Sequence, residues 1–125
     1  MNFFLDSSFA IDFLRNRPEA VERFTRLVEG GDNAFINDVV VCELATGSPA
    51  DDRGLRAFIR AVEYVQPPPD VSVVAGQWRR DARRRGFTLS VPDALIAATA
   101  STLGARLLTR NVRHFELTSI PIEQY

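Results

Sequence analysis

Short apolar runs that alternate with longer helical segments are the feature that most restricts the fold of this chain. The runs Asn2–Leu5 and Ala34–Asn37 each have the length of a buried strand, and each is followed by apolar residues at helical spacing. Arg106–Thr109 continues the pattern, Tyr64–Val65 is a shorter candidate, and Ile120–Glu123 contains a proline typical of an edge strand. Strands separated by helices favour parallel pairing with helices on both faces. The sequence therefore predicts an α/β fold with a mostly parallel central sheet.

Polar capping residues predict where several of the helices begin. A helix from Ser7 is expected to break at Pro18, which starts a second helix that ends at Gly30. Three further starts carry a candidate N-cap: Ser48 before a helix through Val62, Asp70 before a helix over 71–85, and Ser90 before an alanine-rich helix that stops at Gly104.

Length and composition indicate one globular domain, and nothing in the sequence requires an oxidising compartment. A chain of 125 residues, 46% hydrophobic and 25% charged, has the profile of one globular domain over residues 1–125. Its first residues lack the positive segment of a signal peptide, and no run reaches the length of a membrane span. The single Cys42 cannot form an internal disulfide, so a cytoplasmic protein is expected. A net charge of −1 argues against nucleic-acid binding through bulk electrostatics alone.

Four polar residues occupy positions that a parallel sheet would bring together. Asp6 comes directly after the first strand, Glu43 lies about one helical turn beyond the second, and Asn111 follows the strand Arg106–Thr109. Asp93 lies in the first turn of the alanine-rich helix. Because ligands of such sheets bind outside the carboxyl ends of the strands, we expect the first three residues to meet at one edge. The helix that carries Asp93 could join them there.

Carboxylates gathered in this way need a cation or a proton to offset their repulsion. At a separation of about 4 Å, each pair repels by roughly 4 kcal/mol if the effective dielectric constant is about 20. Oxygen ligands suit Mg²⁺ or Mn²⁺, whereas one Cys and one His far apart do not form a zinc site. A carboxylate-held Mg²⁺ polarises a phosphoryl oxygen and acidifies a bound water. Metal-dependent hydrolysis of a phosphodiester is therefore the activity that these acids favour.

Each of these residues also has a purely structural explanation. Asp6 can cap the helix that follows it, Asp93 can complete a capping box with Ser90, and Glu43 can be a solvated helix residue. Asn111 fits ordinary turn chemistry. Because no single residue distinguishes the two explanations, the functional prediction depends on their joint placement.

The order of four segments resembles the signature motifs of PIN-domain nucleases. The segments are FFLDSS, VVVCELATG, SVPDALIAATA and LLTRNVRHF, which together span nearly the whole chain. The length and span are similar to those of the bacterial VapC-type toxins of toxin–antitoxin pairs. The resemblance implies a PIN-like three-layer α/β/α sandwich and Mg²⁺- or Mn²⁺-dependent endoribonuclease activity. In that reaction a metal-activated water attacks the phosphodiester, and the products carry a 5′-phosphate and a 3′-hydroxyl. It also implies inhibition by a cognate VapB-type antitoxin and assembly as a homodimer.

The resemblance also implies roles for individual residues. Asp6 and Asp93 match the principal metal-binding aspartates of the family, and Glu43 matches its central catalytic acid. Asn111 stands where many relatives have a fourth acid, so a one-metal mechanism is expected. Thr109 matches a family Thr or Ser whose hydroxyl could orient a water or the phosphate.

The basic residues are all arginines, and five of the fifteen lie between residues 79 and 85. Spacings of four place them in stripes on the predicted helix, which is either a solvated face or a surface for RNA phosphates or an acidic antitoxin segment. Two more arginines follow the last predicted inner strand, near the expected site. The candidate RNA or antitoxin contacts are Arg79, Arg80, Arg83, Arg84, Arg110 and Arg113.

Two other classes of function compete with a ribonuclease toxin. One is a catalytically weak PIN-like subunit of a DNA-binding complex with its antitoxin, which the presence of all three acids disfavours. The other is a phosphatase that forms an aspartyl phosphate, which is disfavoured because Ser8 stands two residues after Asp6, where a second aspartate is needed. Structural roles are expected for His114, beside Phe115, and for Cys42, through packing.

Overall fold

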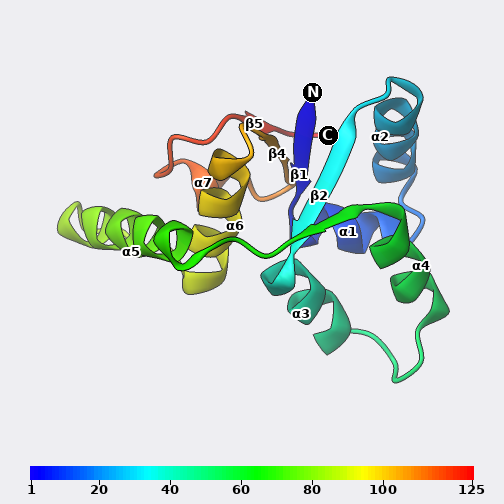
Figure 1. Ribbon diagram of the computed structural model, residues 1–125, viewed down its shortest axis with the longest axis horizontal. Coiled ribbons are helices and arrows are strands. Elements are labelled where there is room, and N and C mark those ends of the chain that lie inside the picture. Colours follow the sequence, from blue (N-terminus) through cyan, green and yellow to red (C-terminus); the bar gives the residue numbers. More distant parts are fainter.

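The computed structural model describes residues 1–125 and contains one five-stranded parallel sheet (Figure 1). The spatial order of the strands is β3-β2-β1-β4-β5, and all four pairings are parallel. The sheet confirms the predicted α/β class. The strands are β1 (Asn2–Leu5), β2 (Asn33–Asn37), β3 (Glu63–Val65), β4 (Arg106–Leu108) and β5 (Ile122–Glu123).

Helices cover both faces of the sheet, as the predicted three-layer sandwich requires. Figure 1 shows α1, α2 and α4 on one side and α5, α6 and α7 on the other, with α3 near the carboxyl end of β2. None of the helices combines the length and the apolarity needed to cross a membrane. The helices are α1 (Ser7–Leu14), α2 (Pro18–Glu29), α3 (Asp38–Thr46), α4 (Arg53–Ala61), α5 (Pro69–Arg84), α6 (Val91–Thr102) and α7 (Val112–Phe115).

The central strand β1 fixes the position of Asp6. Its residues Phe3, Phe4 and Leu5 are buried, because helices cover both sides of a central parallel strand. Leu5 pairs with Leu108 of β4, and the backbone N–H of Asp6 donates to the Leu108 carbonyl at 3.0 Å. The ladder therefore continues one residue beyond β1 and holds Asp6 at its carboxyl end.

The strand order creates a crevice beside Asp6. After β1 the chain passes through α1 and α2 to β2 on one side, whereas β4 lies on the other side of β1 and is reached through α5 and α6. Connections that leave neighbouring strands in opposite directions open a space at the carboxyl ends of those strands. This topological switch point lies between β1 and β4.

Two predicted helix starts are wrong, and two other predictions at element ends are confirmed. Ser48 does not cap α4, because its hydroxyl donates back to the Leu44 carbonyl at the end of α3; Asp52 caps α4 by accepting from the Leu55 N–H at 3.0 Å. Pro68 is the N-cap of α5, which leaves Asp70 within its first turn. Ser90 caps α6 as predicted, and β5 is an edge strand.

Candidate active site

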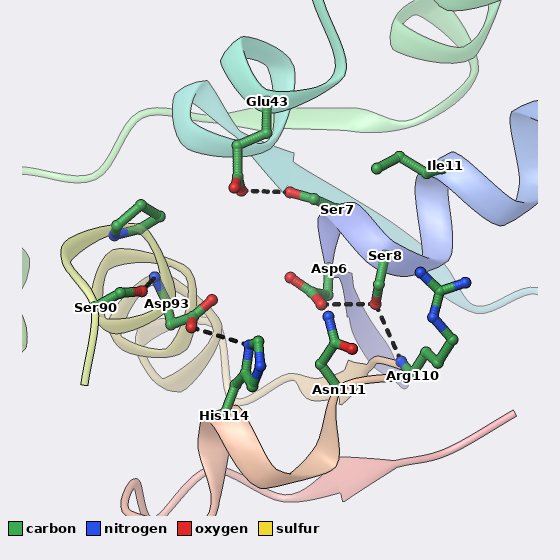
Figure 2. Close-up of a pocket in the computed structure, with 11 residues that line it drawn as sticks. Asp6, Ser7, Ser8, Ile11, Glu43, Ser90, Asp93, Arg110, Asn111 and His114 are labelled. Atoms are coloured by element: carbon green, nitrogen blue, oxygen red, sulfur yellow. Dashed lines mark hydrogen bonds and ion pairs between the residues drawn. The ribbon is translucent and has the colours of Figure 1, made fainter. Parts of the chain in front are cut away.

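A cavity of about 340 Å³ opens at the carboxyl ends of β1 and β4 (Figure 2). Its walls come from the start of α1, from α3, from the start of α6 and from the segment that joins β4 to α7. Segments far apart in the sequence therefore meet at the predicted edge of the sheet. Five predicted residues line the cavity: Asp6, Glu43, Asp93, Asn111 and Arg110.

Asp6 lies at the bottom of the cavity and is held by two hydroxyls. Its side chain is buried, with 4% exposure, and Oδ2 accepts from Ser8 Oγ at 2.8 Å and from Thr109 Oγ1 at 2.7 Å. Figure 2 shows the other carboxylate oxygen directed into the cavity. The resemblance implied that the Thr109 hydroxyl could orient a water or the phosphate. Thr109 is fully buried, and its hydroxyl orients Asp6 instead.

Asp93 faces Asp6 from the first turn of α6. Its backbone N–H donates to Ser90 Oγ at 3.2 Å, and its Oδ2 lies 3.3 Å from His114 Nδ1. Burial raises the pKa of the Asp93 carboxyl, and the charge of Asp6 adds to this effect, against the opposing contributions of Ser90 and His114. The sequence predicted a structural role for His114, and its side chain also lines the cavity.

Glu43 lines the cavity but does not complete a cluster of three acids. It is an exposed residue on the α3 wall, and its Oε1 accepts from Ser7 Oγ at 2.6 Å (Figure 2). No three Asp, Glu, His or Cys side chains of the protein lie together as a ready metal site. The predicted convergence is therefore incomplete: Glu43 lines the same cavity as the two aspartates, but its carboxylate is hydrogen-bonded to Ser7.

The donor set nevertheless fits a hard divalent cation. Asp6 and Asp93 each have one carboxylate oxygen that makes none of the hydrogen bonds described above. Figure 2 shows that these two oxygens point into the same space. Mg²⁺ is commonly held by one or two carboxylates and retained waters, and it does not need an all-protein cage. Burial of Asp93 next to another acid also leaves negative charge that a cation would offset.

Of the predicted arginines, Arg110 lines the cavity and the others do not. Arg110 lines the cavity beside Asn111, whose backbone N–H donates to Thr109 Oγ1 at 2.9 Å. Arg113 is exposed and does not line the cavity. The arginines of α5 lie on a helix that extends away from the sheet (Figure 1), where Arg79 Nε donates to the Leu89 carbonyl at 2.9 Å. Cys42, predicted to pack, is exposed.

Sequence reasoning missed the hydroxyls that hold the acids. Ser7 and Ser8 follow Asp6 directly, and each donates to a different carboxylate of the cavity. The adjacent Asp-Ser-Ser triplet was a signal for such a network, because hydroxyls next to a buried acid commonly satisfy it.

The chain belongs to the PIN domain family, whose profile matches residues 3–119. It is similar to ribonuclease VapC19 of Mycobacterium tuberculosis, with 33% identity over 114 residues that cover 90% of this chain and 91% of the relative. It is also similar to the tRNA(fMet)-specific endonuclease VapC of Salmonella typhimurium, with 29% identity over 133 residues and coverage of 100% and 98%. These matches confirm the resemblance noted from the sequence motifs.

Comparison with solved structures agrees with this assignment. The structure of DNA-bound VapBC from Salmonella typhimurium superimposes with a TM-score of 0.83 and 30% identity, covering 99% of this chain and 98% of the other. The predicted PIN-like fold is therefore confirmed over nearly the full length of the chain.

Proposed function

We propose that the protein is an Mg²⁺- or Mn²⁺-dependent endoribonuclease that acts as the toxin of a toxin–antitoxin pair. The observation that carries this proposal is the single cavity that Asp6, Glu43 and Asp93 share at the carboxyl edge of the sheet. Membership of the PIN family and the ribonuclease names of its relatives support RNA as the substrate.

Asp6 and Asp93 would hold the cation, and Glu43 would supply a third carboxylate from the opposite wall. When bound, the ion would polarise a phosphoryl oxygen and acidify a water. Ser8 and Thr109 fix the Asp6 carboxylate, while Ser90 and His114 contact Asp93, so both aspartates are oriented before substrate binds. Hydrolysis breaks the bond between phosphorus and O3′ and leaves a 5′-phosphate and a 3′-hydroxyl.

The neutral side chain at position 111 supports a site for one ion. Figure 2 shows Asn111 beside Asp6, where an acid would add a further negative ligand. An amide instead offers N–H donors to a phosphate oxygen, as does the Arg110 guanidinium in the same cavity. The exposed arginines Arg80, Arg83 and Arg84 of α5 are a second candidate surface for RNA or antitoxin.

The partner of the toxin would be a VapB-type antitoxin. The solved VapBC complexes of relatives support this partner, and the DNA in the Salmonella structure supports a further role as a subunit of a DNA-bound complex. This second function is compatible with catalysis, because the acids of the cavity are all present. Exposed apolar residues on and near α5, among them Val73, Val74 and Phe87, support a homodimer. We place this single domain in the cytoplasm, where RNA is available.

Cleavage of a fluorescent RNA by the purified protein in Mg²⁺ or Mn²⁺ tests the proposal. Asp6→Asn and Asp93→Asn should each reduce the cleavage rate by more than about 100-fold, because each removes a charged ligand. Asp51→Asn, which changes an exposed acid that does not line the cavity, is the matched control and should cleave normally. Circular dichroism would verify that all variants fold.

Sequencing the ends of the cut RNA would establish the predicted 5′-phosphate. Equal cleavage in EDTA by the wild type and both cavity variants would show that the activity does not come from this site.

A further inference from the structure

Asp12 is a buried acid that the proposed mechanism does not use. It lies on α1, one helical turn after Ser8, with 5% exposure. A buried carboxylate is costly unless charged or polar groups compensate it. Its Oδ1 accepts from Arg110 Nη1 at 2.6 Å, and its Oδ2 accepts a short hydrogen bond from the Tyr125 hydroxyl. Two segments about a hundred residues away in the sequence therefore meet at this one carboxylate.

Tyr125 is held in place by more than this hydrogen bond. Its ring packs edge-on against Phe9, with centroids 4.8 Å apart, and its hydroxyl lies 3.4 Å from the Ser8 carbonyl. Burial and the adjacent Asp12 carboxylate raise the pKa of the Tyr125 hydroxyl, so that it remains a donor at neutral pH.

Arg110 connects this cluster to the cavity. Its backbone N–H donates to Ser8 Oγ at 3.1 Å, and the same hydroxyl donates to Asp6. The side chain is half-exposed at 52% and makes one hydrogen bond to the protein, which leaves most of its five N–H donors for a ligand. Figure 2 shows the guanidinium alongside α1, near Ser8 and Ile11, at the edge of the cavity and not between the two aspartates.

We infer that Asp12 and Tyr125 are positioning residues that hold Arg110 at the cavity edge to bind an RNA backbone phosphate next to the scissile one. The inference rests on the proposed ribonuclease function. A guanidinium binds phosphate through parallel N–H donors, and its flexible side chain loses rotamer freedom when it does so. Because Asp12 already fixes the side chain, part of that loss is incurred during folding and not during binding.

Charge and position make opposite predictions for Asp12. If only net charge mattered, Asp12→Asn would strengthen RNA binding, because the substitution removes a negative charge close to a polyanion. If Asp12 positions Arg110, the same substitution should weaken binding. Tyr125→Phe changes no charge and removes only the hydroxyl, so it tests the positioning role independently of electrostatics.

The experiment is a double-mutant cycle with Tyr125→Phe and Arg110→Gln. The dissociation constant of a short fluorescent single-stranded RNA is measured in EDTA, and cleavage kinetics are measured in Mg²⁺. Tyr125→Phe should raise Kd and KM by about two- to tenfold, with kcat within about twofold of wild type. Arg110→Gln should raise KM and flatten the salt dependence of log Kd by about 0.7.

In the double variant, Tyr125→Phe should add nothing to the effect of Arg110→Gln. The matched control is Tyr64→Phe, which alters the other tyrosine of the chain, is 48% exposed on β3, and should change neither constant. Thermal unfolding of each variant verifies the fold.

Independent, additive effects of the two substitutions would overturn the positioning role, as would tighter RNA binding by folded Asp12→Asn. Those results leave cleavage by the wild type intact and so do not affect the proposed function. A wild-type protein that neither binds nor cleaves RNA would overturn both.

Discussion

Asp93 combines its proposed role with a cost to stability. Its carboxyl is partly buried, and burial raises its pKa above the ordinary value of 3.8, with a further contribution from the charge of Asp6. The folded protein therefore holds this proton more tightly than the unfolded chain does. The proton on Asp93 therefore stabilises the folded protein. This stabilisation is complete at pH values below the pKa of the unfolded chain and is lost as the pH rises through the higher pKa of the folded protein. At neutral pH the ionised group opposes folding.

Asp93→Asn should therefore raise the melting temperature of the metal-free protein at pH 7, because the amide removes the partly buried charge. The gain should shrink as pH falls towards 3.8, where the wild-type carboxyl also becomes neutral. Scanning calorimetry in EDTA across this pH range would measure it. Asp81→Asn, at an exposed acid on α5, serves as control and should show no such gain. A lower melting temperature for Asp93→Asn at pH 7 would contradict this account.

The start of α6 shows how one capping residue serves both an element and the site. Ser90 accepts from the Asp93 N–H and begins a helix whose inner face is mostly alanine, with Ala94, Ala97 and Ala100 fully buried. Small side chains let α6 pack closely against its neighbours, and its first turn lines the cavity. The cap thus sets the direction from which Asp93 enters the cavity.

Ser90→Ala should cost about 1 kcal/mol of stability, because one backbone N–H of α6 loses its partner. It should also slow RNA cleavage by about tenfold or more, since the turn that carries Asp93 is less well fixed. Asp52→Ala is the matched control: it removes the cap of α4, should cost a similar free energy, and should leave cleavage unchanged. Urea unfolding and initial cleavage rates would separate the two effects. Equal cleavage by both variants would argue against a positioning role for Ser90.

At the scale of the whole molecule, the sheet turns distant residues into neighbours. Asp6 and Thr109 are 103 residues apart, yet parallel pairing of β1 with β4 places them in hydrogen-bond contact. Folding therefore brings Asp6 and Asp93 close together, so that their carboxylates repel each other in the native state. An ion that binds only the folded protein should relieve that repulsion and stabilise the whole domain.

Mg²⁺ or Mn²⁺ should raise the melting temperature in a concentration-dependent manner. At a hundredfold excess over the dissociation constant, the gain is about 2.7 kcal/mol, or about 10 °C for a domain of this size. The increase should be much smaller for Asp6→Asn and Asp93→Asn and unchanged for Asp51→Asn. Differential scanning fluorimetry measures all four proteins, and identical shifts in all of them would place the metal elsewhere.

The amino-acid sequence by itself determined the class of fold, because apolar runs and helical spacing specify the elements and the parallel sheet follows from their alternation. It also placed Asp6 and Asp93 at element ends, where motif and topology agree. It did not determine the start of α4, since Ser48 and Asp52 are both competent caps and the packing of α3 and α4 selects between them.

Only the tertiary structure decided which side chains contact one another in and around the cavity. Several contacts join residues that are distant in the sequence and meet only because the layers pack together. They are the hydrogen bond from Thr109 to Asp6, the one from Ser7 to Glu43, the approach of His114 to Asp93, and the link from Arg110 through Asp12 to Tyr125. Local sequence rules describe neighbours along a helix or strand, whereas a buried polar group takes whichever partner the fold brings within reach.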